Sequence, residues 1–264
     1  MLPRIPDYTD VLKEAVNLRK ENSAQSLSAA KTKLLEALRQ FPTAALPLTD
    51  ELVTVLLYQN QDTAAKGELD KLIGRFPDPG EETLCRFGKI YKRIAERYRQ
   101  SNSVPQAINN LQISEEYYHK AFEKSKGFYP LINELTIRFL RAVLLKSSDE
   151  GEASQVLLGE IRAAAKKMLD DPQVWLERKA DDHIWVPATR GEALLLRGEF
   201  DEAEIAYEEA KKQALKEPGQ AKFYFDCMRD QIRNFLIPAY EQLDLAFTGP
   251  LATPESFFQL SRND

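Results

Sequence analysis

The chain has 264 residues, of which 43% are hydrophobic and 29% charged, and its formal net charge at pH 7 is −5. This balance is typical of a folded, helix-rich protein and excludes a chain that is disordered throughout. A net negative charge argues against a surface built to hold polyanions, so we expect no direct binding of nucleic acid.

The cysteines and the N-terminal segment give the expected cellular setting. Cys85 and Cys227 lie too far apart in the sequence for a metal-binding pair, and two cysteines do not make a disulfide framework. The segment Met1–Asp7 has no apolar signal region, and no later apolar stretch approaches the roughly 20 residues that cross a bilayer. We therefore expect a cytoplasmic protein with no membrane partner.

A repeat begins in the first third of the chain. A small residue, an apolar residue four positions later and a closing proline occur twice, with Ala65 following Ala30 by 35 positions. The two sets are Ala30, Leu34, Ala37 and Pro42, then Ala65, Leu69, Leu72 and Pro77. A period near 34 residues with this pattern marks tetratricopeptide helical hairpins. The same period, carried forward from Val53, leads to Gly88 with Tyr91 three positions later.

The same signature returns later in the chain. Its residues are Gly191, Gly198, Phe200, Ala203, Tyr207, Ala210 and Pro218. Small residues let two antiparallel helices approach closely, and the aromatic residues fill the space between hairpins. Between Gly88 and Ala121 the signature is stretched, and we assign the extra residues to an insertion around Arg99–Pro105.

The sequence predicts an all-α fold, a tetratricopeptide-like helical-hairpin solenoid of about eleven helices without a strand. The expected helices are 7–21, 24–41, 46–59, 62–75, 81–99, 104–124, 130–147, 150–169, 183–196, 200–215 and 219–246. We expect residues 1–247 to form a single solenoid domain. Residues 248–264 carry Gly249, Pro250 and Pro254 and are predicted to form a C-terminal strap or a flexible tail.

The helix expected at 81–99 carries a basic segment. In tetratricopeptide hairpins the first helix of each pair lines the concave groove, and the inward repeat positions here are Glu82, Cys85, Lys89, Lys92 and Arg93. From Arg86 to Arg99 the segment is strongly basic in a chain that is acidic overall. It is either an anion-binding groove or a solvated face paired with neighbouring acids.

The repeat that starts at Ile184 adds an aromatic and an acidic group. The same numbering points Trp185 and Glu192 inward, with Thr189 and Arg190 beside them. A tryptophan there either stacks on a flat ring or seals the core. Cations, an aromatic ring and a carboxylate acceptor together suit the phosphate, base and ribose hydroxyl of a nucleotide-like ligand. We expect Lys89, Lys92 and Trp185 to face one concavity.

Catalysis has little support in the sequence. The histidines are His119 and His183, and neither belongs to a phosphate loop, a serine nucleophile motif or a metal-spaced cluster. We interpret Asp181, Asp182 and His183 as an acidic helix cap and not as a metal site. We therefore expect no enzyme activity, no catalytic or metal-binding residues and no cofactor.

Segments Glu82–Lys92, Gly127–Asn133 and Ile184–Thr189 resemble, in order and spacing, three blocks of the tetratricopeptide-repeat sensor domain family. That family is the bacterial relative of the central regulatory (TRAF-binding) region of apoptosis-signal-regulating kinases. The resemblance covers roughly residues 45–245. Lys89 stands where the family has Arg, and Leu131 where it has Gly, so a bidentate contact is lost at Lys89.

The resemblance implies a regulatory sensor that binds a nucleotide-like, possibly NAD-derived, ligand and signals to an effector protein in a bacterial stress or defence system. The matched positions are Lys89, Tyr91, Lys92, Tyr129, Asn133, Trp185, Thr189 and Glu192, to which the inward repeat position adds Arg93. The alternative is a protein–protein adaptor that grips an acidic peptide or a C-terminal carboxylate with Lys89, Lys92 and Arg93.

Overall fold

The structure is a computed structural model that describes residues 7–177, 179–217 and 219–259. Within these ranges the chain is helical and has no β-strand, which confirms the predicted all-α class. The longer helices are α1 (Tyr8–Glu21), α2 (Ala24–Gln40), α3 (Ala45–Tyr58), α4 (Asp62–Arg75), α5 (Glu81–Gln100), α6 (Val104–Ser125), α7 (Phe128–Ser147), α8 (Gly151–Asp170), α9 (Asp182–Arg197), α10 (Phe200–Ala214) and α11 (Ala221–Gln231). None of the described helices has the length and apolar character of a membrane span.

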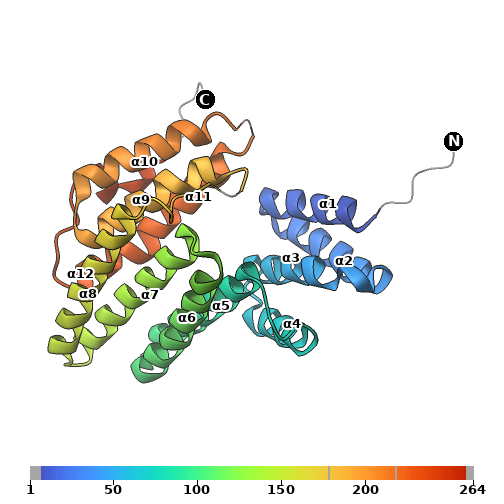
Figure 1. Ribbon diagram of the computed structural model, residues 1–264, viewed down its shortest axis with the longest axis horizontal. Coiled ribbons are helices and arrows are strands. Elements are labelled where there is room, and N and C mark those ends of the chain that lie inside the picture. The colour runs from blue at the N-terminus through green and yellow to red at the C-terminus, as the bar shows by residue number, and fades with distance from the viewer. Residues whose placement is uncertain (1–6, 178, 218, 260–264) are drawn as a thin grey trace.

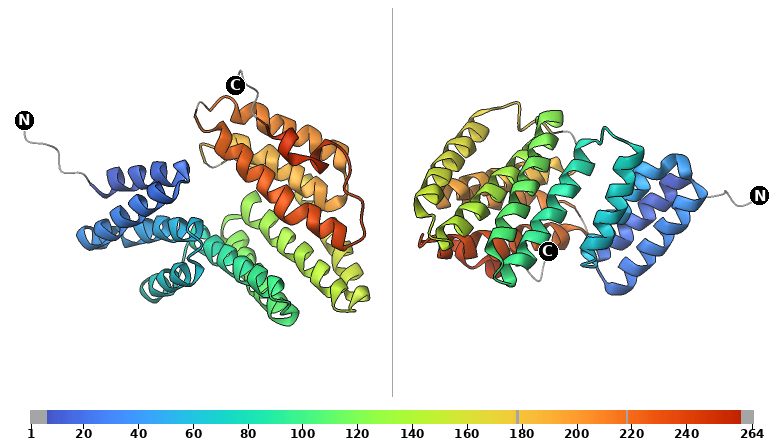
Figure 2. Two further views of the ribbon diagram at one scale, coloured as in Figure 1. Left: turned by 180° about the vertical axis from the view of Figure 1, so that it is seen from behind. Right: turned by 90° about the horizontal axis from the view of Figure 1, so that it is seen from below.

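Successive helices pair into hairpins that follow one another along a curve (Figure 1). The pairs are α1 with α2, α3 with α4, α5 with α6, α7 with α8 and α9 with α10. The curve turns back on itself, so that α1 approaches the C-terminal helices in the view from behind as well (Figure 2). There Lys20 of α1 donates a hydrogen bond of 2.7 Å to Gln220, the residue before α11. The solenoid therefore surrounds a central space.

A glycine faces a tyrosine in two of these hairpins. A Cβ atom added to Gly88 of α5 would lie 2.6 Å from the ring of Tyr118 of α6, and one added to Gly191 of α9 would lie 2.6 Å from the ring of Tyr207 of α10. Both tyrosines are buried. The absence of a side chain on the first helix thus makes room for the aromatic ring on the second, as the repeat signature predicts.

The extra residues expected around Arg99–Pro105 are helical and lengthen the helices on both sides of the turn. Helix α5 continues to Gln100 and α6 starts at Val104, so only a short loop joins them. Instead the two helices are longer, with 20 and 22 residues against 14 each in α3 and α4. The extra residues are absorbed as additional helical turns, which keep their backbone hydrogen bonds inside the helices.

The single helix predicted at 219–246 is interrupted. After α11 the chain forms a π-helical turn at Ile232–Leu236, and α12 covers Ile237–Gln242. Pro238 has no N–H group, and its ring would clash with the carbonyl of Asn234 in a regular α-helix. The wider turn relieves this clash, and the N–H of Ile237 bonds to the carbonyl of Ile232 instead. Pro218, the closing proline of the last repeat signature, lies outside the described residues.

The C-terminal segment lies on the last hairpin. It contains η3 (Pro250–Ala252) and α13 (Pro254–Phe257), and the side chains of Leu251 and Phe258 are buried. The ring of Phe258 packs against Tyr207 of α10 and Phe225 of α11, with centroid distances of 5.7 and 6.3 Å. Residues 248–259 thus have the geometry of the predicted strap, while 260–264 fall outside the described part.

Candidate ligand-binding cavity

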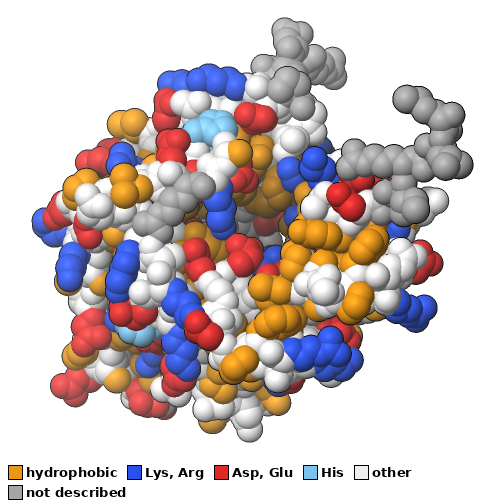
Figure 3. Space-filling model, turned by 45° about the vertical axis from the view of Figure 1, so that its right-hand side comes forward, with side chains coloured by type: hydrophobic (Ala, Val, Ile, Leu, Met, Phe, Trp, Pro, Cys, Tyr) orange, Lys and Arg blue, Asp and Glu red, His pale blue; other side chains and the backbone are white. Residues whose placement is uncertain are grey.

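A cavity of about 940 Å³, here called the central cavity, lies inside the curve of the solenoid. Its wall comes mainly from the first helices of the hairpins, α3, α5, α7 and α9, together with α11. Figure 3 shows the hollow between the N-terminal and C-terminal helices. The volume lies within the range that holds a small organic ligand.

The wall contains all the residues predicted from the sequence except Tyr91. They are Lys89, Lys92, Arg93, Tyr129, Asn133, Trp185, Thr189 and Glu192. Tyr91 stacks on Tyr117 of α6, with ring centroids 5.7 Å apart and planes 12° apart. It occupies the packing position of its repeat, so the structure does not bring it to the cavity.

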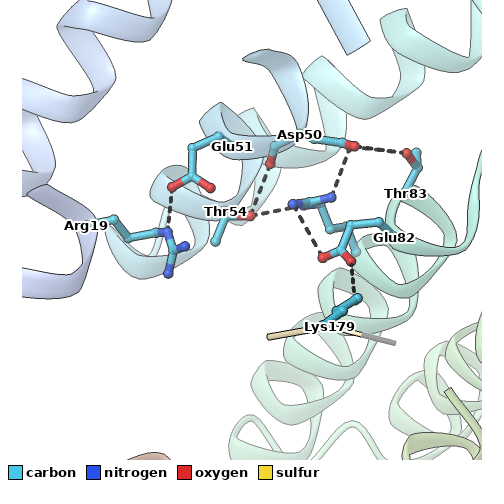
Figure 4. A network of polar contacts seen from close by, with 8 residues as sticks. Arg19, Asp50, Glu51, Thr54, Glu82, Thr83 and Lys179 are labelled. Carbon is cyan, nitrogen blue, oxygen red and sulfur yellow. Dashed lines mark hydrogen bonds and ion pairs between the residues drawn. The ribbon is translucent and has the colours of Figure 1, made fainter. Parts of the chain in front are cut away.

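Arg86, in the basic segment of α5, is held by acids. Its guanidinium group lies 3.1 Å from Asp50 and 3.5 Å from Glu82, and its Nε donates to Thr54. Figure 4 shows this network, in which Lys179 also reaches Glu82 at 3.1 Å. The network joins α3, α5 and the segment before α9, which is a structural role.

Arg93 and Arg97 are also engaged. Arg93 Nε lies 2.8 Å and Arg97 Nη2 2.6 Å from the carboxylate of Asp62, whose side chain is only 1% exposed. Arg93 also donates to the side chain of Asn60. Although Arg93 lines the cavity, its charge is compensated by the carboxylate of Asp62, the first residue of α4. The arginines of the basic segment are therefore paired with acids, including Arg99, which pairs with Glu96 at 2.7 Å.

Lys89 has a different environment. No carboxylate among the described residues lies within ion-pair distance of its ammonium group, which sits 5.5 Å from the centroid of the Tyr58 ring. Burial lowers the pKa of Lys89, and the nearby guanidinium groups of Arg93, Arg19 and Arg86 act in the same direction. Lys89 is thus an amine at the cavity wall without an ion-pair partner among the described residues.

Lys92 lies one helical turn further along α5 and is 9% exposed. Its Nζ is 3.8 Å from the centroid of the Phe235 ring, and in the described part of the chain it has no ion-pair partner. Burial lowers the pKa of Lys92 to about 8, against the opposing effect of the Glu192 carboxylate. Like Lys89, Lys92 is thus a cation without an ion-pair partner among the described residues.

Glu192 of α9 is fixed through one of its oxygens. Oε1 accepts hydrogen bonds from Thr136 Oγ1 at 2.5 Å and from Gln231 Nε2 at 2.7 Å. Burial raises the pKa of Glu192 even though these donors and Lys92 favour its charged form. The described residues donate no hydrogen bond to Oε2. This oxygen can therefore accept a hydrogen bond from a ligand.

The model of the family described as Tetratricopeptide Repeats-Sensor matches residues 14–138. This part of the chain is therefore similar to the tetratricopeptide-repeat sensor family. The match starts and ends earlier than the expected resemblance, which covered residues 45–245. The relation to the kinases stays a prediction. No curated protein matches the chain.

The matched residues, 14–138, supply only part of the cavity wall. Lys89 and Lys92 lie within it, whereas Trp185 and Glu192 belong to α9, beyond the matched residues. The cavity thus forms where residues 14–138 face the C-terminal helices, which add Phe235 from the π-helical turn.

Trp185 is held in place by the residues before α9. Its Nε1 donates to Asp181 at 3.0 Å, and its ring meets the edge of Tyr224 at a centroid distance of 5.4 Å. The predicted acidic cap is wrong at Asp181, because this carboxylate accepts the indole and makes no capping hydrogen bond. The carboxylate of Asp182 accepts the backbone N–H of Lys179 at 2.8 Å. The described residues include no group of three or more potential metal ligands.

The remaining predicted residues have smaller roles in the wall. Tyr129 is 42% exposed, and because it lies deep in the molecule this surface opens into the cavity. Asn133 donates to the carbonyl of Tyr129 at 2.8 Å, and Thr189 is buried. Tyr58 and Phe235 were not predicted from the sequence. They face the two lysines from α3 and from the π-helical turn, and no spacing in the sequence connects those segments.

Proposed function

We propose that the protein is a regulatory sensor that binds a small anionic, nucleotide-like ligand in the central cavity and signals to an effector protein. The observation that carries the proposal is a pair of lysines, the partly buried Lys89 and the buried Lys92, which line one cavity without an ion-pair partner in the described part of the chain. Phosphate or carboxylate oxygens supply the missing charge, and charge-assisted hydrogen bonds are stronger where water is excluded.

The rest of the wall supports a ligand that also has a flat ring and hydroxyl groups. Trp185 is anchored at the wall by Asp181 and offers an aromatic surface for stacking. Glu192 offers Oε2 as an acceptor, while its other oxygen is already occupied. Phosphate, base and ribose combine these three features, and NAD-derived compounds belong to this class. Similarity to the sensor family supports the regulatory role.

The competing function is an adaptor that binds an acidic peptide through Lys89, Lys92 and Arg93. Two observations favour the small ligand. Arg93 is already paired with Asp62. The hydrogen bond from Lys20 to Gln220 joins the two ends of the curve, whereas an extended peptide needs an open groove along several repeats. We propose binding without catalysis, in the cytoplasm, as part of a bacterial stress or defence system.

Native mass spectrometry of the protein purified from its own cells tests this function. We expect a complex with a small phosphorylated compound, whose fraction falls sharply in a Lys89→Met, Lys92→Met double variant. Recovery of an acidic peptide in place of a small molecule would support the adaptor. Recovery of the ligand in equal amounts from the double variant would contradict the assignment of the lysines.

A further inference from the structure

The π-helical turn at Ile232–Leu236 contacts the central cavity at both of its ends. Gln231, directly before the turn, donates to Glu192, and Phe235 within the turn lies under the ammonium group of Lys92. Single π-helical turns occur often at functional sites. This turn is therefore coupled to the two groups that would bind the ligand.

The pair of Lys92 and Phe235 also separates two spaces. Both residues line the central cavity, and both line a smaller pocket of about 40 Å³ between α5, α6, α7 and α12. The other residues of that pocket include the apolar side chains of Leu111, Leu140 and Val143. The ammonium group therefore rests against the ring, between the central cavity and the smaller pocket.

The outer side of the turn connects to the C-terminal segment. Arg233, which is exposed, lies 3.0 Å from Glu255 of α13. A rearrangement of the turn would thus move a charged pair on the surface. A conformational change at the cavity could thus reach the protein surface through a few identified contacts.

We propose that Lys92 and Phe235 form a latch, which an anionic ligand opens by drawing the ammonium group away from the ring. This inference rests on the proposed function and names how the site signals. A cation over an aromatic ring is held by its attraction to the π electrons. A charge-assisted hydrogen bond to phosphate is stronger and requires contact near 2.8 Å, so an anion in the central cavity draws the ammonium group away from the ring. Ligand binding therefore frees Phe235, and the turn, released from this contact, exchanges its amide hydrogens faster.

Amide hydrogen exchange of residues 232–240 in the full chain, with and without ADP or inorganic pyrophosphate, tests the latch. We expect either anion to speed exchange several-fold in the wild-type protein and to have no effect in Lys92→Met. Phe235→Leu keeps an apolar side chain but loses the ring, so it should bind the anion several-fold more tightly because the ammonium group is no longer held. If Phe235 only packed the fold, its loss would not raise the affinity for the anion, so the sign of the change separates the two roles.

The matched control is Phe122→Leu on α6, away from the cavity. It removes a ring whose centroid lies 5.2 Å from the ammonium group of Lys126. It should change neither the affinity nor the exchange of 232–240. If an anion binds the wild-type protein but leaves the exchange unchanged, or if Phe235→Leu binds no more tightly, the latch is wrong and the proposed function stands. If neither anion binds the wild-type protein, the latch is wrong, and the proposed function also fails if no nucleotide of a wider panel that includes NAD-derived compounds binds.

Discussion

The side chain of Gln231 at the end of α11 bonds to Oε1 of Glu192 on α9 at 2.7 Å, although 39 residues separate them. Thr136 of α7 donates to the same oxygen. One carboxylate oxygen therefore joins three helices, and the other remains open to a ligand. This division explains how a buried acid can serve both the fold and the binding of a hydroxyl group.

Glu192→Gln should weaken the binding of a hydroxyl-bearing nucleotide at least tenfold, because a hydrogen bond to a charged group contributes about 1.5–3 kcal/mol. The amide oxygen still accepts from Thr136 and Gln231, so the thermal midpoint should change little. Calorimetric titration with ADP measures the affinity. Glu208→Gln, at a partly exposed pair with Lys211 on α10, is the control and should bind as the wild-type protein does. Equal affinity in both variants would exclude Glu192 from the site.

Anion binding should weaken with rising pH because Lys92 must be protonated to bind. The pKa of Lys92 is lowered to about 8, so its charged fraction falls about tenfold between pH 7 and pH 9. The affinity for pyrophosphate, whose own charge only grows over this range, should fall by a similar factor. Lys92→Met should show weak binding without this fall. Affinity that is constant or rising from pH 7 to 9 would rule out a contact with Lys92.

Removing Asp62 should destabilise the fold. Asp62 is buried and compensates both Arg93 and Arg97, so Asp62→Ala should cost about 2 kcal/mol in the free energy of unfolding. Asp70→Ala, which breaks a more exposed pair with Lys66, should cost at most about 0.5 kcal/mol. Urea unfolding gives both values. A stable Asp62→Ala variant with strongly altered nucleotide affinity would show instead that Arg93 binds the ligand.

Gly191→Ala should destabilise the last hairpin by about 1–3 kcal/mol, because the added methyl group meets the buried ring of Tyr207 at 2.6 Å. Gly159→Ala provides the opposite case. It lies inside α8 with nothing within 4 Å of the new Cβ, so the better helix former should stabilise the protein by up to about 1 kcal/mol. Thermal unfolding of both variants checks the signs, and a stable Gly191→Ala variant would mean that the helices are not packed this closely.

The helices were predictable because periodic apolar residues and local turns define them. The second helix was expected at 24–41 and covers Ala24–Gln40. The repeat phase also pointed Lys89 and Trp185 to one cavity, since inward positions follow from hairpin geometry alone. The π-helical turn had a signal that was overlooked, because Pro238 in the middle of a predicted helix requires a local change.

The pairing of the basic segment was not predictable. Arg93 and Arg97 meet Asp62 more than 30 residues earlier in the chain, and that contact depends on the angle between α4 and α5. The sequence therefore shows a row of cations but not which are compensated. The same limit applies to Phe235, whose contact with Lys92 brings together helices with several others between them in the sequence.

The most direct test is calorimetric titration of the wild-type protein and the Lys89→Met, Lys92→Met double variant with a panel of nucleotides, including NAD-derived cyclic compounds. A Lys66→Met, Lys71→Met double variant on α4, away from the cavity wall, controls for the loss of charge. We predict that at least one nucleotide binds the wild-type protein and the control equally, and that the cavity variant loses at least a hundredfold in affinity. If no nucleotide binds the wild-type protein, and an acidic peptide does and loses affinity in the cavity variant, the sensor function is wrong and the adaptor replaces it.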